Sequence, residues 1–422
     1  MPHLIIVHSQ FESEDDVKTR LEKEIENVMH NIANFKPGGF VNSIEKAAEV
    51  IKTLKEKTTG LVILTATGGT EEYIQKIVSE IETRILIWAN GQNNSFAASL
   101  EAYAFLKDKF PVKLYHSESM SNDRQRVQKF IRVCETIGMI NNSNVGIIGE
   151  PSDWLLTSKG VKSFGQFSTT LTAIKLKELI SEVKDVMDAE SHSRAGEFKK
   201  MYGDVEVSDE ALQGSAKVSI GLRRVIERNK LNAVTIRCFD LLENKYTACM
   251  GLSVQNDEGV VAGCEGDLHA LFSMMLGTYI TQKPSWMANP SGIDKTDNSI
   301  VLAHCTVPSK MIADLSKSTL KSHMESGLST GIQGQMPKKK VTIFRIGGEF
   351  NKLTAVTGKI VNPFLNDNSL CRTQIKINLN CNINDWIESS LGNHQIMVYD
   401  DIIQELSDFC HFTGVDFNWL NN

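Results

Sequence analysis

The sequence lacks the features of several protein classes. Its 422 residues include eight cysteines, and no two of them form a CxxC pair. This spacing excludes the common thiolate zinc sites and provides no disulfide framework. No run approaches the roughly 18 apolar residues of a membrane span, and the start, MPHLIIVHSQFESEDD, lacks the basic residues and long apolar stretch of a signal peptide. We therefore expect a cytoplasmic protein without a membrane partner.

The sequence also lacks an excess of positive charge. The 45 Lys and Arg residues are outnumbered by 51 Asp and Glu residues, which gives a net charge of -6. No stripe of basic residues alternates with aromatic ones, so we expect no nucleic-acid partner. Hydrophobic residues at 41% and charged residues at 23% are ordinary for a globular protein, and the length allows two or three domains.

The first part of the chain alternates short apolar runs with amphipathic segments. The runs are LIIVHS, GLVILTA, RILIWAN, VKLYHS and NVGIIGEP. This alternation predicts an α/β, doubly wound, Rossmann-like domain over residues 1–155, with a parallel sheet. The turn TATGGTEEY matches neither GxGxxG nor the P-loop, and we interpret it as a strand-to-helix turn with Thr70 as N-cap. The missing GxGxxG also argues against a dinucleotide-dependent oxidoreductase.

Two further domains follow from changes in the pattern. A second α/β domain is predicted over residues 156–330, with strands at NAVTIRCF and ACMGLSV. Over residues 331–422, alternating β-branched residues in KKKVTIFRIGG, KLTAVTGKIV and CRTQIKINLN predict a small antiparallel, β-rich and barrel-like domain. A final helix is predicted from Asp400 to Phe412.

Several chemically active residues stand where apolar runs end. Glu265 follows a predicted buried strand, where a helix N-terminus alone would explain a carboxylate. Its spacing of four residues from His269 would place both on one helix face and suit a divalent metal, although such pairs are more often surface residues. His304 ends the run SIVLA and is equally compatible with a hydrogen-bonded core histidine. Oxygen and imidazole ligands without thiolates favour Mn, Mg or Fe over structural zinc.

A resemblance to a known family carries these observations further. The combination of NDEG, CEGD, KPSWMAN and HC over about residues 230–308 resembles the central region of the L-fucose isomerase family, in the L-fucose and L-arabinose isomerase superfamily. The likeness extends more weakly to GNHQIMVYDD and to the N-terminal half. It implies the interconversion of aldoses and ketoses through an enediol, a Mn²⁺ cofactor, a sugar substrate and a homo-oligomer.

The resemblance also implies roles for individual residues. Glu265 and His394 match metal ligands of the family, and Asn289 occupies the place of its aspartate. An amide cannot act as a base near neutral pH, so Asp294 or His304 would have to replace the missing carboxylate. We therefore expect catalysis by Glu265, Asn289 and Asp294 and metal binding by Glu265, Asn289 and His394.

Other residues near these positions are expected to bind the sugar. We expect His304, Trp286 and Asn256 to contact the substrate. The leading hypothesis is a divalent-metal-dependent aldose–ketose isomerase. The alternative is a non-catalytic or redirected carbohydrate-binding descendant of the same fold, and Asn289 is the feature that separates the two.

Overall fold

The computed structural model describes residues 1–421, which form two compact units. Unit 1 comprises Met1–Gly138 together with Gln404–Gly414, and unit 2 comprises Met139–Ile403 with the chain from Val415 onward. The α/β fold class with a separate antiparallel sheet near the C-terminus is confirmed. None of the helices in the described part of the chain combines the length and hydrophobicity that a membrane span requires.

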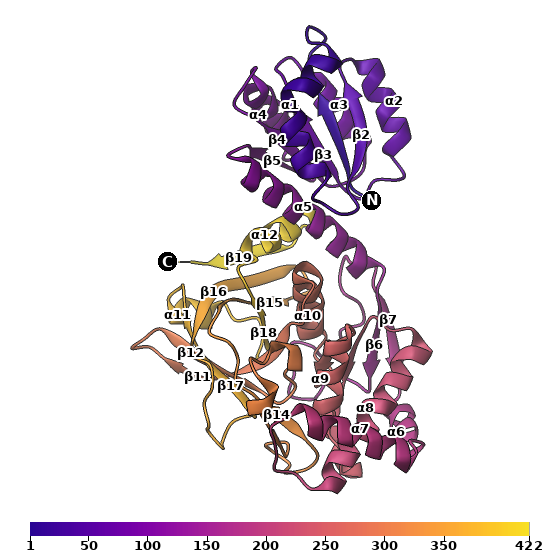
Figure 1. Ribbon diagram of the computed structural model, residues 1–422, viewed down its shortest axis with the longest axis vertical. Helices are drawn as coiled ribbons and strands as arrows, with labels where there is room; N and C mark the ends of the chain where they lie inside the picture. The colour runs from indigo at the N-terminus through magenta and orange to yellow at the C-terminus, as the bar shows by residue number, and fades with distance from the viewer. Residues whose placement is uncertain (422) are drawn as a thin grey trace. The chain divides into compact units, whose positions relative to one another are not determined.

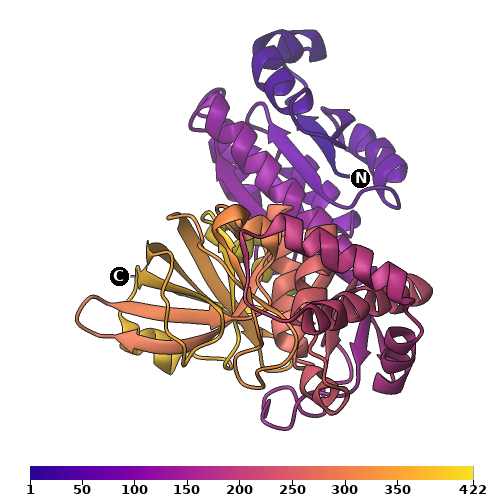
Figure 2. The same ribbon diagram turned by 60° about the horizontal axis from the view of Figure 1, so that its bottom comes forward.

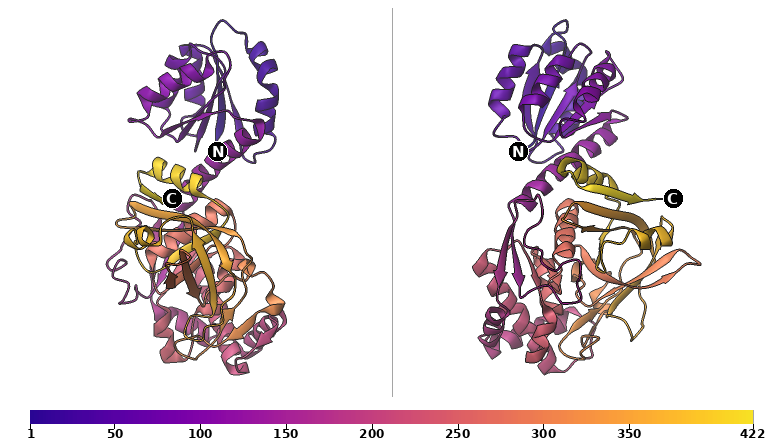
Figure 3. Two further views of the ribbon diagram at one scale, coloured as in Figure 1. Left: turned by 90° about the vertical axis from the view of Figure 1, so that its left-hand side faces the viewer. Right: turned by 180° about the vertical axis from the view of Figure 1, so that it is seen from behind.

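Unit 1 contains a five-stranded parallel sheet in the order β2-β1-β3-β4-β5. Odd-numbered strand residues such as Ile5, Ile63 and Ile87 face a core formed with α2, α3 and α4, and helices cover both faces of the sheet (Figures 1 and 3). Thr70 is the N-cap of α3, but its hydroxyl bonds to the Thr67 carbonyl instead of capping the helix. The elements of this unit are β1 (His3–Val7), α1 (Glu14–Met29), β2 (Lys36–Val41), α2 (Ile44–Leu54), β3 (Leu61–Thr65), α3 (Glu71–Glu80), β4 (Ile85–Ala89), α4 (Ser95–Leu106), β5 (Val112–His116), α5 (Met120–Asn141) and α12 (Ile403–Thr413).

Unit 2 begins with a parallel sheet in the order β10-β9-β6-β7. Strand β6, formed by the NVGII run that we predicted for the first sheet, therefore pairs with β7 and β9 instead. The predicted strand ACMGLSV is wrong, because these residues begin helix α9. The elements are β6 (Asn144–Ile148), β7 (Thr170–Ile174), α6 (Leu176–Lys184), α7 (Asp188–Met201), β8 (Asp204–Val205), α8 (Asp209–Asn229), β9 (Ala233–Ile236), a 3₁₀ helix (Cys238–Asn244), α9 (Cys249–Glu258), β10 (Val261–Cys264) and α10 (Leu268–Thr281).

A seven-stranded sheet in the order β15-β18-β11-β12-β17-β16-β19 forms the rest of unit 2, together with the short strands β13 and β14. Alternate residues such as Ile300, Leu302 and Ile377 face its core, which explains the alternating pattern of the sequence. The hairpin of β11 and β12 extends away from the sheet (Figure 2). The elements are β11 (Trp286–Asp294), β12 (Ser299–His304), β13 (Thr319–Lys321), β14 (Gly331–Gln333), β15 (Lys340–Gly347), β16 (Lys352–Asn362), β17 (Thr373–Leu379), α11 (Ile383–Glu388), β18 (Gln395–Tyr399) and β19 (Asp416–Leu420).

Candidate active site

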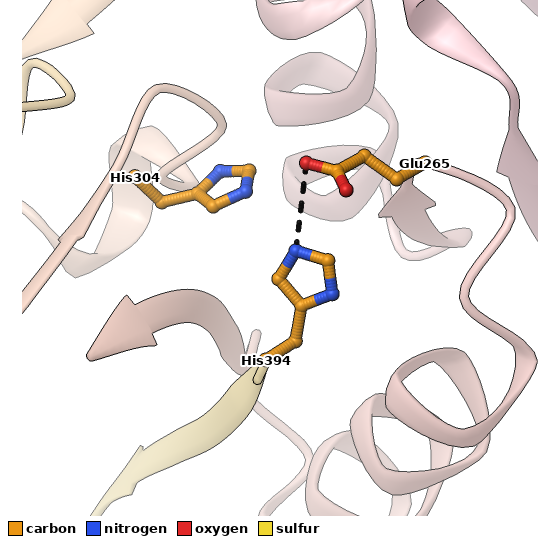
Figure 4. Close-up of side chains that lie close together, drawn as sticks. All are labelled: Glu265, His304 and His394. Carbon is orange, nitrogen blue, oxygen red and sulfur yellow. Dashed lines mark ion pairs between the residues drawn. The ribbon is translucent and has the colours of Figure 1, made fainter. Parts of the chain in front are cut away.

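Three side chains from distant parts of the chain meet in unit 2, each at the end of a strand. Glu265 follows β10, His304 is the last residue of β12, and His394 immediately precedes β18. Their nearest ligand atoms all lie within 4.8 Å of one another, and they form the one such group of His, Cys, Asp and Glu found in residues 1–421. Figure 4 shows the three side chains pointing toward a common centre. All three are buried, with exposed fractions of 8%, 4% and 0%.

The backbone around Glu265 is sharply turned. Glu265 has a φ of 63°, which is uncommon for a residue with a side chain, and Gly266 has a φ of 74°. A Cβ on Gly266 would stand 2.7 Å from both the Glu150 carbonyl oxygen and the Pro151 Cα, so only glycine fits. Asp267 then caps α10 by accepting from the Ala270 N–H. The CEGD sequence is therefore a tight strand-to-helix turn, in which Glu265 precedes the first residue of the helix.

Asp267 fixes the orientation of His394. Its Oδ2 lies 2.8 Å from the His394 Nδ1, which must donate its proton to the carboxylate. The other ring nitrogen, Nε2, faces Glu265 Oε1 at 3.6 Å and is buried without a hydrogen-bond partner; it can bind a metal when the ring is neutral. Arg345 bonds to both oxygens of Asp267 and to the His394 carbonyl. A carboxylate behind a ring nitrogen is the usual support of a metal-binding histidine.

His304 has two possible proton arrangements. The Thr306 N–H donates to its Nδ1 at 3.3 Å, while the Thr306 hydroxyl lies 2.7 Å from the same nitrogen. When Nδ1 only accepts, Nε2 carries the proton and can donate to a substrate oxygen. When the Thr306 hydroxyl accepts from Nδ1–H, the bond from the Thr306 N–H is lost, and Nε2 has a free lone pair for a metal. Thr306 therefore supports either role.

Burial and neighbouring charges set the protonation states of the three side chains. Burial opposes ionisation of Glu265, but His394 and the Trp154 indole N–H outweigh it, so the pKa of Glu265 lies below its ordinary value. Burial lowers the pKa of His304 to about 4, with a further contribution from His394. Burial also opposes protonation of His394, yet Asp267 and Glu265 together raise its pKa. At neutral pH the site therefore contains an ionised carboxylate and a neutral His304.

Glu265 connects this buried group to a cleft of about 490 Å³, which also contains a second carboxylate, two amides and two aromatic side chains. Trp154 is half-exposed, donates to Glu265 Oε2 at 2.6 Å, and meets the Phe239 ring edge-on at 5.0 Å. Aromatic faces beside amides and carboxylates suit a polyhydroxylated ligand with an apolar face. The lining residues are Trp154, Phe239, Glu265, Asn289, Pro290, Glu325 and Asn393.

The donor set fits a divalent metal. One carboxylate and two imidazoles are typical ligands of catalytic zinc and of non-haem iron, and imidazole and carboxylate also bind manganese. The unpartnered Nε2 of His394 supports this fit, because a buried polar atom without a hydrogen-bond partner is costly. The ligand set predicted from the sequence contained Asn289 instead of His304. Asn289 lines the cleft, where its Oδ1 accepts from Asn393 at 3.4 Å, while His304 supplies the third donor of the group.

Three other predicted site residues lie outside the cleft. Asp294 is at the exposed end of the β11 hairpin, paired with Lys376 at 3.0 Å, and strand geometry puts it about 16 Å from Asn289. Trp286 is fully buried in the core of the seven-stranded sheet. Asn256 is buried and bonds to the backbone of Leu252 and Ala262. Burial leaves Trp286 and Asn256 no free face for a sugar, and Asp294 is too far along the hairpin to reach the cleft.

The proposed pairing of Glu265 and His269 on one helix face is wrong. Helix α10 begins at Leu268, after Glu265. His269 is buried, stacks on Phe350 with ring centroids 4.4 Å apart, and has a ring nitrogen 2.9 Å from the Gly348 carbonyl oxygen. It is a hydrogen-bonded core histidine.

Trp154 and Arg345 were missed in the sequence. Trp154 follows the strand NVGII in the segment GEPSDW, so the rule that ligands gather at strand ends could have found it. Arg345 lies inside the otherwise uncharged run VTIFRIG of strand β15. A single charged residue in a buried strand could have indicated a buried ion pair there.

Comparison with known proteins shows similarity to isomerases over most of the chain. A sulfoquinovose isomerase of Alkalicoccus urumqiensis is 19% identical over 413 residues, which cover 93% of both chains. The sulfoquinovose isomerase of Priestia aryabhattai is 20% identical and covers 88% of this chain and 87% of its own. That of Clostridium sp. (strain MSTE9) is 20% identical and covers 82% and 83%. These relatives support an isomerase relationship without pointing to fucose isomerase in particular.

Other comparisons add little. No family model matches the chain. The sugar-binding protein of a sugar ABC transporter from Bacillus halodurans is 11% identical and covers 67% of this chain and 87% of its own, with a TM-score of 0.19. A score that low carries no structural argument.

Proposed function

We propose that this chain is an aldose–ketose isomerase that acts through an enediol and uses a divalent metal. The observation that carries the proposal is the buried group of Glu265, His304 and His394 at the wall of a cleft suited to a sugar. The similarity to sulfoquinovose isomerases over 93% of the chain supports the same reaction class. It also makes sulfoquinovose the first sugar to test.

Glu265 is the residue that we assign to proton transfer. Isomerisation requires a base that removes the proton next to the carbonyl and returns it to the neighbouring carbon. Glu265 is ionised at neutral pH and reaches the cleft. Its Oε2 accepts one bond from Trp154, and a carboxylate oxygen has room for a second proton donor. The indole therefore holds the base in one orientation without blocking it.

The remaining residues position the sugar and the cofactor. Glu265, His304 and His394 would hold a divalent cation, which would stabilise negative charge on the two oxygens of the enediolate. The amides of Asn289 and Asn393 can donate to sugar hydroxyls, and the exposed face of Trp154 can pack on the apolar face of the ring. Glu325 is the second carboxylate at the cleft and can accept from hydroxyls.

Deuterium exchange tests this assignment directly. The purified protein is incubated with Mn²⁺ in D₂O with sulfoquinovose and, separately, with a panel of unmodified aldoses. We expect ketose formation and deuterium at carbon 2 of the recovered aldose, because the base exchanges its proton with solvent. Glu265→Gln should lower both rates by about 10²-fold or more. Glu325→Gln, which removes the other cleft carboxylate, should mainly raise KM.

Two outcomes would contradict the proposal. If Glu265→Gln retains full exchange while Glu325→Gln abolishes it, the base is misassigned. If sugars bind but neither ketose nor deuterium appears with any of them, the protein is the non-catalytic carbohydrate-binding descendant.

A further inference from the structure

Five cysteines of unit 2 are grouped beside the candidate site. Cys264 immediately precedes Glu265, and Cys305 immediately follows His304. Cys305 interacts with the thiols of both Cys249 and Cys371. The Sγ atoms of Cys238 and Cys264 lie 3.0 Å apart. The function proposed above uses none of these thiols.

The Cys238–Cys264 contact follows from the parallel sheet. Strands β9 and β10 pair in parallel with Cys264 opposite Ile236, so Cys238 leaves the neighbouring strand just beyond Cys264. A disulfide has an S–S length of about 2.05 Å, and the two sulfurs need to approach by only about 1 Å to form one. Both cysteines are free thiols in this structure.

We propose that Cys238 and Cys264 form an oxidative modification site, at which a peroxide converts the two thiols into an intramolecular disulfide. The Cys238 sulfur attacks one peroxide oxygen, which breaks the O–O bond and gives a sulfenic acid and one water. The Cys264 sulfur then displaces the sulfenic oxygen as a second water. In sum, two thiols lose two protons and two electrons, and one hydrogen peroxide is reduced to two waters.

A small cavity lies beside Cys238. It has a volume of about 10 Å³ and is lined in part by Cys238, Phe239 and His323. A volume of this size is at the lower limit for one water molecule, so the side chains that line the cavity must move for hydrogen peroxide to reach the Cys238 thiol. Phe239 also lines the sugar cleft, so the thiol pair lies one side chain away from it.

The disulfide would act on the neighbouring Glu265. The turn at Glu265 and Gly266 is fixed by two positive φ angles and by the tight contact with Glu150 and Pro151. A shift of Cys264 therefore cannot be absorbed in the turn and moves the Glu265 carboxylate. This consequence rests on the proposed function, and a misplacement of about 1 Å can lower turnover about a hundredfold.

Peptide mapping tests the modification without relying on activity. The full-length reduced protein is treated with stoichiometric hydrogen peroxide, denatured, alkylated and digested without reductant. We expect a loss of two hydrogen atoms in mass, a linked peptide containing Cys238 and Cys264, and reversal by dithiothreitol. Recovery of both cysteines in alkylated form, or a disulfide made by Cys305 instead, would overturn the proposal.

Activity measurements on cysteine variants after peroxide treatment test whether the disulfide lowers turnover. Cys238→Ser should keep its activity and resist peroxide, while wild type loses about a hundredfold and recovers with dithiothreitol. Cys381→Ser, which changes another buried cysteine of unit 2, should respond like wild type. Equal inactivation of Cys238→Ser and wild type would refute the effect on Glu265. If the reduced protein isomerises no sugar, the proposed function fails while the peptide map still decides the modification.

Discussion

Asp267 supports a candidate metal ligand and is not itself a residue that contacts the sugar, because it is fully buried and does not line the cleft. Its carboxylate bonds to His394 Nδ1 and to the buried Arg345. Burial raises its pKa, but Arg345 and His394 outweigh burial and hold the pKa of Asp267 far below its usual range. A permanently charged Asp267 therefore holds Nδ1 of His394 and leaves Nε2 facing the candidate site.

Asp267→Asn keeps the shape of this side chain and removes its charge. We expect Mn²⁺ affinity to fall about 10- to 100-fold, because a supporting carboxylate orients the ligand ring and increases its basicity. We also expect a loss of about 3 kcal/mol in unfolding free energy, since Arg345 loses its buried counter-charge. Calorimetric Mn²⁺ titration and urea unfolding measure the two effects. Asp294→Asn, which changes an exposed carboxylate, is the control, and an unchanged Mn²⁺ affinity in Asp267→Asn would contradict the assigned role.

His304 should make the stability of the metal-free protein depend on pH. Its pKa is about 4 in the folded protein and 6.5 in the unfolded chain. Between these values the unfolded state binds more protons, so stability is full above pH 6.5 and falls as the pH decreases toward 4, by at most about 3 kcal/mol. His394 has a raised pKa, and its contribution is lost above pH 6.5, outside this window. Thermal melts of wild type and His304→Asn from pH 7 to 4 should converge at low pH, and parallel curves would show that His304 is not the cause.

At the scale of one element, strand β11 carries three predicted site residues in three environments. Trp286 is in the core, Asn289 lines the cleft, and Asp294 is exposed. We expect Trp286→Ala to cost about 3–5 kcal/mol in stability, Asn289→Ala to lower kcat/KM with little loss of stability, and Asp294→Ala to change neither by much. Urea unfolding and sugar kinetics on the three variants test this order. A strong loss of turnover in Asp294→Ala would restore its predicted catalytic role.

The sequence predicted local structure better than sheet membership. The strand runs of unit 1 and the alternation over 340–379 appear as predicted, because periodicity reports which faces of one element are buried. Strand β6 joins the second sheet because pairing depends on distant residues. Helix α9 is buried on all sides from Cys249 to Asn256, so its apolar start has no periodic signal to distinguish it from a buried strand.

The sequence named residues of the candidate site but not which side chains face the cleft. Glu265 and His394 were named through resemblance, and the structure brings them together. Asn289 and Trp286 came from the same segment, KPSWMAN, in which alternate side chains of a strand face opposite sides. The sequence alone did not say which of them faces the cleft. Asp267 has a role that depends on Arg345, 78 residues away, and such a pair leaves no local pattern.

At the scale of the whole molecule, unit 1 is completed by a segment from near the end of the chain. Helix α12 packs within this unit, where Phe412 contacts Phe130 edge-on at 5.6 Å and a ring nitrogen of His411 lies 2.9 Å from the Val112 carbonyl oxygen. The carboxylate of Asp408 is fully buried and pairs with Lys113 at 2.7 Å and Arg126 at 2.8 Å. No local pattern in the sequence predicts that this helix belongs to unit 1.

Asp408→Ala should therefore destabilise unit 1 and leave the candidate site unchanged. The substitution leaves two largely buried cations without a counter-charge, and breaking such a pair costs about 3–5 kcal/mol. Hydrogen exchange should become faster in β1, β3, β4, β5 and α12, because local stability sets the opening of each amide. Mn²⁺ affinity should not change, since Glu265, His304 and His394 all belong to unit 2.

Glu80→Ala, which removes a partly exposed ion pair of α3 with Lys76, should cost no more than about 1 kcal/mol and serves as the control. Equal acceleration of exchange in both units would show that they unfold together, and unchanged exchange in unit 1 would show that Asp408 does not hold α12 in place.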